Sequence, residues 1–533
     1  MKFINKLFCK ICSIYKNDII FFTIIFILLF ITDAYFNIKS NQYNSCIYTL
    51  IYAYAISSTI CLIYSYVDRY KYFRKAIDII TIFFFCIYNT INAFSIFLTL
   101  KPLNGGTIEI ILSTNYNETI EFFHSFISAQ HLLLALSAIT GFIILSLKKI
   151  QIKKEWSNYI LSLLYILSIF SIIIGDYDTL NTPLGRLYNI YKVKHLIELT
   201  PNLDLYKSNP NFVETTEAHP ENIVIILGES FAKTHSSLYG YEKNTNPSLY
   251  THQKDSNLHI FNNTTSPATH TLAAFKAIMG TFSYNRECKE WYKHTTIPEC
   301  LSLLGYKTIW ISNQEQYGIR DNIPTRFAQL CDTVLFTQKK TSDKFNDEEI
   351  LNYIDENPLK KELFILHLMG QHPQYSERYP DKFNIFKEDE YLYLPQNQRK
   401  KVSEYDNATL YNDFVIDSII HIFSKKEAII LYFSDHGQDI YFSDKDYCGH
   451  GITANAKSDS IGRDIPFMIY TSPKFKDKYP SLIEKIKKST NKKFNIEDII
   501  YTLIDISGYK FKDNNDVEKY SIFSNWYLLV RSK

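Results

Sequence analysis

Long uncharged stretches recur in the first third of the chain and then give way to a mixed pattern of apolar and polar residues. A helix needs about 20 apolar residues to cross a bilayer. Five stretches are long enough, namely 19–38, 46–67, 79–100, 127–147 and 157–175. The first is the weakest, because Asp33 lies near its far end. Five such stretches so close together are not typical of a buried helical core, so the pattern predicts five transmembrane helices within residues 1–177.

Lysine and arginine are distributed unevenly among the segments that flank these stretches. The basic clusters are Lys2, Lys6, Lys10 and Lys16; Arg69, Lys71, Arg74 and Lys75; and Lys148, Lys149, Lys153 and Lys154. The alternate loops hold one lysine each, Lys39 and Lys101. Since basic loops stay in the cytoplasm, we expect a cytoplasmic amino terminus. An odd number of crossings then puts everything after residue 177 outside, which in a bacterium means a multi-pass inner-membrane protein with a periplasmic domain.

After residue 177 the pattern predicts a connector followed by an α/β domain. Residues 178–220 mix aromatic and basic residues, which suits a segment along the membrane surface, although a plain linker with one amphipathic helix fits nearly as well. Short, continuous apolar runs then alternate with helical periodicity, and they cover 221–230, 306–314, 362–372 and 427–437. This alternation is typical of a mostly parallel sheet with helices on both faces. We therefore expect a soluble α/β domain over residues 221–533.

Charge and cysteine content change this picture only a little. The net charge is +2 over 533 residues, which does not favour a nucleic-acid-binding protein. Four cysteines lie in the outer part, where an oxidising compartment permits disulfides: Cys288, Cys300, Cys331 and Cys448. The pair that we expect is Cys288–Cys300.

Acidic and histidine residues stand where three of the predicted strands end. Glu229 ends the first run, His367 and His372 end the third, and Asp435 and His436 end the last. Ligands of such sheets bind beyond the carboxyl ends of the strands. Zinc is bound by carboxylate oxygen and imidazole nitrogen, and a catalytic zinc keeps one position for a reacting group. Glu229, Asp435 and His436 are therefore candidate zinc ligands, although Asp435 and His436 could also form a salt-bridged corner.

A hydroxyl group is a candidate for the fourth position, because a metal ion makes it a strong nucleophile. In SPATHTLAAFKAIMG, residues 266–280, Thr271 could open a helix whose dipole favours a developing phosphate charge. Thr269 is a rival, and either threonine alone would more often be a helix cap. Glu229 alone would more often pair with a cation, and His450 in CGHGITAN could be a loop histidine. Together, in a membrane-tethered domain, these residues favour a metal-dependent hydrolase or transferase over a binding module.

Several motifs follow one another in a recognisable order. They are GESFAKTHSSLYGYEKNTNP at 228–247, then SPATHT, HLMGQHP, YDNATLYNDF and SDHG. With them the chain resembles, over nearly its whole length, the lipid-linked phosphoethanolamine transferases of the alkaline phosphatase and sulfatase superfamily. The resemblance implies that Glu229, Asp435 and His436 hold a zinc ion and that Thr271 becomes phosphoethanolaminylated. Two histidines, His372 and His450, would contact the transferred phosphate or a second zinc.

The resemblance also suggests residues for binding the substrate. His367 matches a further histidine of the family and is expected in the substrate-binding set. Thr114 and Glu118 stand at i and i+4 in the loop 104–127 and could share a helix face toward the lipid head group, with a solvated helix face as the alternative. Three positions depart from the family pattern: Gln438 and Asp439 replace a frequent Glu-Ser pair, and Lys276 replaces a frequent proline.

The implied reaction is a ping-pong transfer. Thr271 attacks the phosphorus of phosphatidylethanolamine, diacylglycerol leaves, and an acceptor takes phosphoethanolamine from Thr271. The acceptor is expected to be lipopolysaccharide or another envelope glycan. Lipid A is a less safe choice, because the cysteines do not match the multi-disulfide arrangement of lipid A-modifying members. The alternatives are a phosphoglycerol transferase of the lipoteichoic acid synthase type, a sulfatase-like phosphodiesterase, and an inactive membrane receptor or assembly factor. The resemblance implies one bound zinc ion, with two as the alternative.

Overall fold

The computed structural model divides the chain into two compact units, Met1–Leu196 and Ile197–Lys533. The residues that it describes are 2–39, 42–99, 102–103, 129–146, 155–174, 186, 188, 210–216, 219–286, 291–314, 323–338, 346–355, 361–444, 447–450 and 456–527. Each unit is described by itself.

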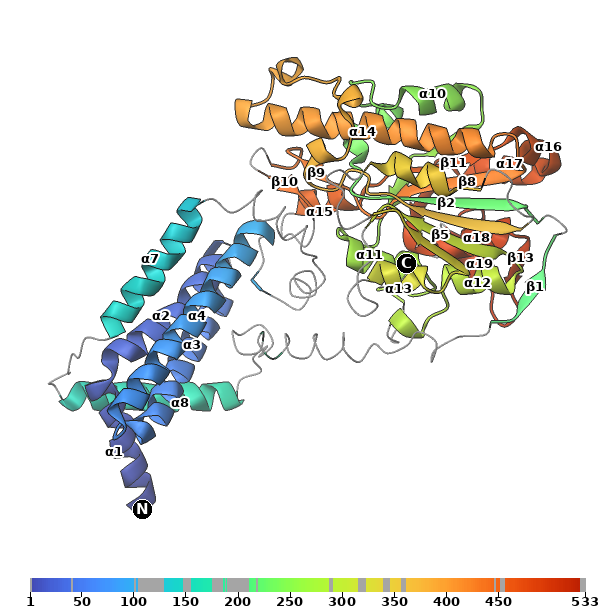
Figure 1. Cartoon of the computed structure of the whole chain (residues 1–533). Coiled ribbons are helices and arrows are strands. Elements are labelled where there is room, and N and C mark those ends of the chain that lie inside the picture. The colour runs from blue at the N-terminus through green and yellow to red at the C-terminus, as the bar shows by residue number, and fades with distance from the viewer. Residues whose placement is uncertain are drawn as a thin grey trace. The chain divides into compact units, whose positions relative to one another are not determined.

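α-Helices make up the described part of the first unit (Figure 1). They are α1 (Lys2–Asn17), α2 (Ile19–Lys39), α3 (Tyr43–Tyr64), α4 (Lys71–Thr99), α7 (Ala129–Ser146) and α8 (Glu155–Ile174). Each of the five predicted spans coincides with one of these helices, beginning with α2. Among the described residues, three helices are long and apolar enough to cross a membrane: Ile19–Ile38, Tyr43–Val67 and Lys71–Ile96. The unit is therefore a helical membrane region with three candidate spans, and five crossings stay a prediction.

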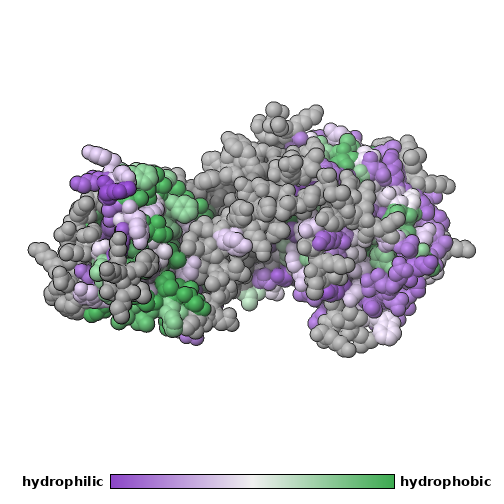
Figure 2. Space-filling model, turned by 90° about the horizontal axis from the view of Figure 1, so that it is seen from below, coloured by the Kyte–Doolittle hydropathy of each residue, from purple (hydrophilic) through white to green (hydrophobic). Residues whose placement is uncertain are grey.

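The first unit exposes apolar side chains, as a protein surface in contact with lipid does. Ile80, Phe170 and Ile173 are all more than half exposed, and the green surface on the left of Figure 2 belongs to this unit. Asp33, the charge within the first span, is buried beside Arg186, whose Nη1 donates to its Oδ1 over 2.8 Å. Asn92 of α4 donates to the same oxygen over 2.8 Å. These partners explain how an apolar helix accommodates a carboxylate.

A seven-stranded sheet forms the centre of the second unit, in the order β3-β11-β8-β2-β7-β5-β6. The strands are β2 (Asn222–Gly228), β3 (Leu258–Phe261), β5 (Lys307–Ser312), β6 (Thr333–Phe336), β7 (Glu362–His367), β8 (Ala428–Ser434) and β11 (Phe467–Thr471). The sheet is mixed: β8, β2, β7, β5 and β6 pair in parallel, and β11 runs antiparallel to both of its neighbours. The four predicted runs correspond to β2, β5, β7 and β8.

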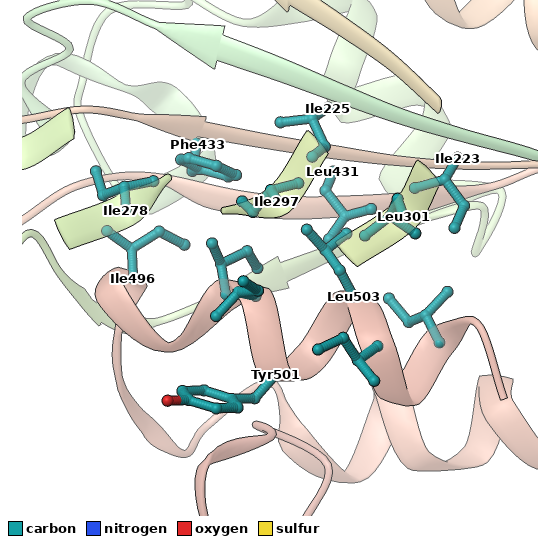
Figure 3. Packing of buried hydrophobic residues seen from close by; sticks show 14 of the residues in the cluster. Ile223, Ile225, Ile278, Ile297, Leu301, Leu431, Phe433, Ile496, Tyr501 and Leu503 are labelled. Carbon is teal, nitrogen blue, oxygen red and sulfur yellow. The ribbon is translucent and has the colours of Figure 1, made fainter. Parts of the chain in front are cut away.

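Helices cover both faces of the sheet. One face carries α11 (Thr271–Ile278), α12 (Ile297–Leu303), α13 (Ile323–Ala328), α17 (Pro480–Ser489) and α18 (Ile499–Ile506). The other face carries α10 (Pro247–Lys254) and α14 (Gln396–Phe423). Successive side chains of a strand point to opposite faces, so Ile223 and Ile225 of β2 enter the first core, shown in Figure 3, and Val224 enters the second. Burial on both faces explains why this strand is continuously apolar.

Smaller elements complete the described part of the second unit. Two-stranded sheets pair β1 (Phe212–Glu214) with β13 (Tyr509–Phe511), β4 (Asn263–Thr265) with β12 (Lys493–Asn495), and β9 (Asp439–Ile440) with β10 (Cys448–Gly449). The remaining α-helices are α15 (Ala456–Arg463), α16 (Pro473–Lys478) and α19 (Asp516–Tyr520). Cys300 is a buried free thiol in α12, so the expected Cys288–Cys300 disulfide is wrong; Cys288 itself lies outside the described residues. Burial of Cys300 against the apolar core explains its place better than a cross-link does.

Candidate active site

The parallel pairing of β2 and β8 brings three predicted metal ligands together. Gly228 lies beside Ser434 in the register of the two strands, so the next residues leave the sheet side by side. Nε2 of His436 lies 3.2 Å from Oε1 of Glu229 and 3.4 Å from Oδ2 of Asp435. All three side chains are buried, and each offers one ligand atom within 4.8 Å of the others. The predicted cluster at the strand ends is thus present in the structure.

The Thr271 hydroxyl lies next to this group. Thr271 is the first residue of α11, after the extended residue His270. Its Oγ1 lies 3.4 and 3.3 Å from the two carboxylate oxygens of Glu229, and 3.3 Å from Nε2 of His436. The rival Thr269 is buried, with its side-chain methyl group against Gly462. The Thr271 hydroxyl thus lies within reach of both Glu229 and His436, and the Ser230 hydroxyl donates to Oε1 of Glu229 over 2.8 Å.

The hydrogen bonds around the group leave ligand atoms available for a metal ion. Nδ1 of His436 lies 2.9 Å from the carbonyl oxygen of Gly437 and must donate to it, which leaves the Nε2 lone pair facing the carboxylates. Oδ1 of Asp435 accepts from the backbone N–H groups of Ser230 and His436 over 3.2 and 2.7 Å. In the described structure the buried Oδ2 of Asp435 accepts no hydrogen bond. Two carboxylates, an imidazole oriented by a carbonyl group, and a hydroxyl are a donor set that fits zinc.

The charges of the group are out of balance without a cation. Burial opposes the ionisation of Glu229, but the hydrogen bond and charge of His436 outweigh it and hold the pKa of Glu229 well below its usual value. Burial, followed by the charge of Glu229, raises the pKa of Asp435 to about 8. Burial alone would lower the pKa of His436, but Asp435 and Glu229 raise it to about 9. Two buried carboxylates thus compete for one positive partner, as expected where a metal ion displaces protons on binding.

Two predicted histidines border the group. The His450 ring lies against the His436 ring, with centroids 4.3 Å apart, and its Nδ1 donates to Oε1 of Gln438 over 2.5 Å. Burial lowers the pKa of His450 well below its usual value, and His436 adds to this effect. Burial, with the charge of Arg378, lowers the pKa of His372 to about 4. Both rings are therefore neutral at pH 7, and Gln438, a departure from the family pattern, orients one of them.

Comparison with known proteins identifies the family of the chain. A family model described as Sulfatase matches residues 221–509, more than half of the chain. The chain belongs to the sulfatase family. The predicted relationship to this superfamily is thereby confirmed. The match begins at the start of β2 and includes all seven strands of the central sheet as well as the Glu229, Thr271, Asp435 and His436 group.

Relatives of this sulfatase-family chain include phosphoethanolamine transferases. It is 28% identical over 450 residues to phosphoethanolamine transferase EptC of Escherichia coli K12, covering 77% of this chain and 76% of that protein. The C-terminal periplasmic domain of E. coli EptC, solved in complex with zinc, is 26% identical, with a TM-score of 0.55 over 60% of this chain and 91% of that one. The integral membrane protein EptA of Neisseria meningitidis is 15% identical, with a TM-score of 0.64 over 93% and 97%, and shows the fold alone.

The remaining predicted residues are His367, Thr114 and Glu118. His367 is buried at the end of β7, with its ring 5.1 Å from that of Phe275 and 5.8 Å from that of Trp310, and burial lowers its pKa to about 4. Its ring packs against Phe275 of α11, and the charge of Glu229 partly offsets the effect of burial on its pKa. Thr114 and Glu118 lie outside the described residues.

Sequence reasoning missed the residues that hold the site's backbone in place. Asp347 accepts from the N–H groups of Met369 and Gly370 over 2.7 and 2.8 Å, which fixes the loop that carries His372. Gly370 has φ +53, and a Cβ there would lie 2.8 Å from the carbonyl oxygen and 2.9 Å from the nitrogen of Glu229. The glycine within HLMGQHP could have indicated a close backbone contact at Gly370, whereas no local sequence pattern indicates the role of Asp347.

Proposed function

We propose that this protein transfers phosphoethanolamine from phosphatidylethanolamine to an acceptor of the cell envelope by way of Thr271. The observation that carries the proposal is the position of the Thr271 hydroxyl, within 3.4 Å of both Glu229 and His436 at the first turn of a helix. Similarity to phosphoethanolamine transferase EptC over most of the chain supports the choice of the transferred group.

The proposed zinc ion would be held by Glu229, Asp435, His436 and Thr271. When bound, zinc supplies the positive charge that lowers the pKa of a hydroxyl and neutralises phosphate oxygens. His436 fits this role because its Nδ1–H is already engaged by a carbonyl group, which orients Nε2 toward the ligands. A second zinc near His372 and His450 is the alternative to direct contact of these histidines with phosphate.

The residues of the chain then perform two displacements. Thr271 Oγ1 loses its proton and attacks phosphorus, the P–O bond to diacylglycerol breaks, and the diacylglycerol oxygen takes up a proton. The dipole of α11 favours the negative charge that collects on the phosphate oxygens. His372, neutral and half-buried beside the group, can donate a hydrogen bond to those oxygens. In the neutral His450 ring the one N–H is engaged by Gln438, so its Nε2 lone pair can accept a hydrogen bond or hold a second zinc. An acceptor hydroxyl or phosphate then attacks the phosphorus, and Thr271 leaves with a proton.

The membrane region is consistent with a lipid donor. We propose five crossings within residues 1–177, a cytoplasmic amino terminus, a connector over 178–220 and a catalytic domain over 221–533 on the periplasmic face of a bacterial inner membrane. Thr114 and Glu118 remain candidates for the lipid head group, and His367 for the substrate side of the site. Lipopolysaccharide or another envelope glycan is the proposed acceptor.

A direct test uses the purified full-length chain and phosphatidylethanolamine. Peptide mass analysis should find phosphoethanolamine on Thr271, and Thr271→Ala should remove it while the matched control Thr269→Ala retains it. An adduct on Thr269 or Ser230 would refute the choice of nucleophile.

A second comparison tests the donor and the non-enzymatic alternative. Fluorescent phosphatidylethanolamine and phosphatidylglycerol are offered in parallel, and diacylglycerol should be released from the first. Release from phosphatidylglycerol alone would favour the phosphoglycerol transferase alternative. An inactive receptor predicts that Thr271→Ala leaves the envelope glycolipids of cells unchanged, whereas our proposal predicts loss of a phosphoethanolamine-modified species.

A further inference from the structure

A second group of metal-type side chains lies between α10 and α14, on the other face of the sheet from α11. It consists of His252, Asp417 and His421, each with one ligand atom within 4.8 Å of the others. The His252 ring packs edge-on against Tyr470 of β11, with ring centroids 5.6 Å apart. Tyr470 lies beside Ile430 in the sheet register, and Asp435 is five residues further along, about 16 Å at the usual rise of a strand. The group is therefore distinct from the candidate active site.

The three side chains converge from two rigid elements. Asp417 and His421 stand at i and i+4 of α14 and so share one helix face. Nε2 of His252, from the last turn of α10, lies 2.7 Å from Oδ1 of Asp417. Nδ1 of His421 lies 3.4 Å from the same oxygen and donates to the backbone carbonyl oxygen of Asp417 over 3.0 Å, an exposed bond that rotation of the ring would release. The two imidazole rings are 6.0 Å apart between centroids, so both histidines face one carboxylate oxygen.

The position of α10 on α14 is fixed independently of these histidines. One turn earlier on α14, the buried carboxylate of Asp413 accepts from the backbone N–H groups of Ser248 and Leu249 over 2.9 and 3.0 Å. These bonds hold the first turn of α10, and His252 follows one turn later. His252 is thus held beside Asp417 by the packing of the helices, which is the preorganisation that a metal site needs.

The chemistry and exposure of the group select the class of ligand. Two imidazole nitrogens and one carboxylate oxygen suit zinc, nickel or copper, whereas calcium and magnesium prefer oxygen alone. Ligand atoms of a tetrahedral zinc site with bonds of about 2.0–2.1 Å lie about 3.3 Å apart, close to the 3.4 Å between His421 and Asp417. The 2.7 Å between His252 and Asp417 is a hydrogen bond donated by the imidazole, so an ion would displace that proton and separate the two atoms slightly. The His421 side chain is 69% exposed, so its ring can turn and an ion can enter from solvent. We propose that His252, Asp417 and His421 bind a divalent transition-metal ion of the zinc class, which links α10 to α14.

The experiment counts bound metal on the full-length chain in detergent. The protein is stripped with a chelator, equilibrated with zinc and passed through a desalting step, and bound zinc is measured by mass spectrometry; cobalt is then used to record the ligand-field spectrum. His252→Ala and His421→Ala should each bind one equivalent less than the wild type. The same loss should appear in an Asp435→Asn background, where the first site is already impaired.

The matched control is His219→Ala. His219 also pairs with a carboxylate, Nε2 to Oε1 of Glu214 over 2.9 Å, but belongs to no three-ligand group in the described part of the chain. The His219→Ala variant should bind as much zinc as the wild type. Because His421 is largely exposed, its replacement should fold normally, which circular dichroism verifies. Equal zinc in all three single variants, or a cobalt spectrum unchanged by His421→Ala, would overturn the proposal without touching the reaction at Thr271.

Discussion

Replacing Gly370 by alanine should damage the candidate active site through a single added methyl group. Gly370 has φ +53, a conformation that costs other L-residues about 1–2 kcal/mol. The new Cβ would also lie 2.8 and 2.9 Å from the backbone oxygen and nitrogen of Glu229. Overpacking of this kind costs about 1–3 kcal/mol. We expect the free energy of unfolding to fall by about 2–5 kcal/mol in total, since the two effects add.

The structure supplies a control that separates the two contributions. Gly305 also has a positive φ, +85, but a Cβ there would meet nothing within 4 Å. Gly305→Ala should therefore lose only the conformational part, about 1–2 kcal/mol. Urea unfolding of the second unit measures both variants, since this unit contains two hydrophobic cores of its own.

The added methyl group should also weaken zinc binding and slow formation of the Thr271 adduct. Displacement of the Glu229 backbone moves one proposed ligand away from Asp435 and His436, so Gly370→Ala should lose zinc on dialysis and form the Thr271 adduct slowly. Gly305→Ala should keep both properties. If the two variants unfold at the same urea concentration and retain equal zinc, the close contact between Gly370 and Glu229 does not determine the site.

Three further predictions concern other parts of the second unit. Asp347→Asn puts an amide N–H where a carboxylate oxygen now accepts from a backbone N–H group. We expect urea unfolding to show that the free energy of unfolding falls by about 1–3 kcal/mol. An unchanged free energy of unfolding would contradict this role of Asp347. Burial lowers the pKa of His259 from 6.5 to about 4, so its neutral form stabilises the fold above pH 6.5 and this stabilisation is lost as the pH falls toward 4. Relative to His259→Leu, the wild type should lose about 2.5 kcal/mol of unfolding free energy between pH 7.5 and 4.5, and parallel pH profiles would refute the assignment. Removal of metal with a chelator should lower the melting temperature of the wild type, and addition of zinc should restore it. Asp435→Asn should show a smaller shift in melting temperature. Identical shifts in the two proteins would place the responsible ion elsewhere.

The sequence pattern was sufficient to predict the strands that carry the site, but it did not predict the strands at the edges of the sheet. β2, β7 and β8 are six or seven residues long and buried on both faces, so their continuous apolar runs stand out. β3 and β6 have four residues each, too few for a pattern to distinguish them from a buried loop or helix turn. The direction of β11 depends on how the chain returns after α15, and apolarity carries no information about direction. The expected mostly parallel sheet is for this reason better described as mixed.

Candidate ligands were accessible from sequence because parallel strands end at a common edge. Glu229 and Asp435 are far apart in the chain, yet each directly follows a strand, and adjacent strands place them together. The supporting residues had no such signal. Asp347 opens a 3₁₀ helix (Asp347–Tyr353) and acts on a loop more than twenty residues away, and Arg186 lies 153 residues from the carboxylate that it neutralises. Contacts of this kind depend on tertiary packing, which local pattern does not encode.

The ordinary explanations for each isolated ligand can now be weighed against the structure. Glu229 alone would most often pair with a lysine or arginine, but its side-chain partners in the described residues are Ser230, Thr271 and His436. Asp435 and His436 could have formed a closed salt bridge, but the same His436 nitrogen also faces Glu229, so one imidazole is shared between two buried carboxylates. An unpaired buried carboxylate costs several kcal/mol. A divalent cation would satisfy both carboxylates at once, as we propose, and the Thr271 hydroxyl lies within 3.4 Å of two of the ligands that would hold it.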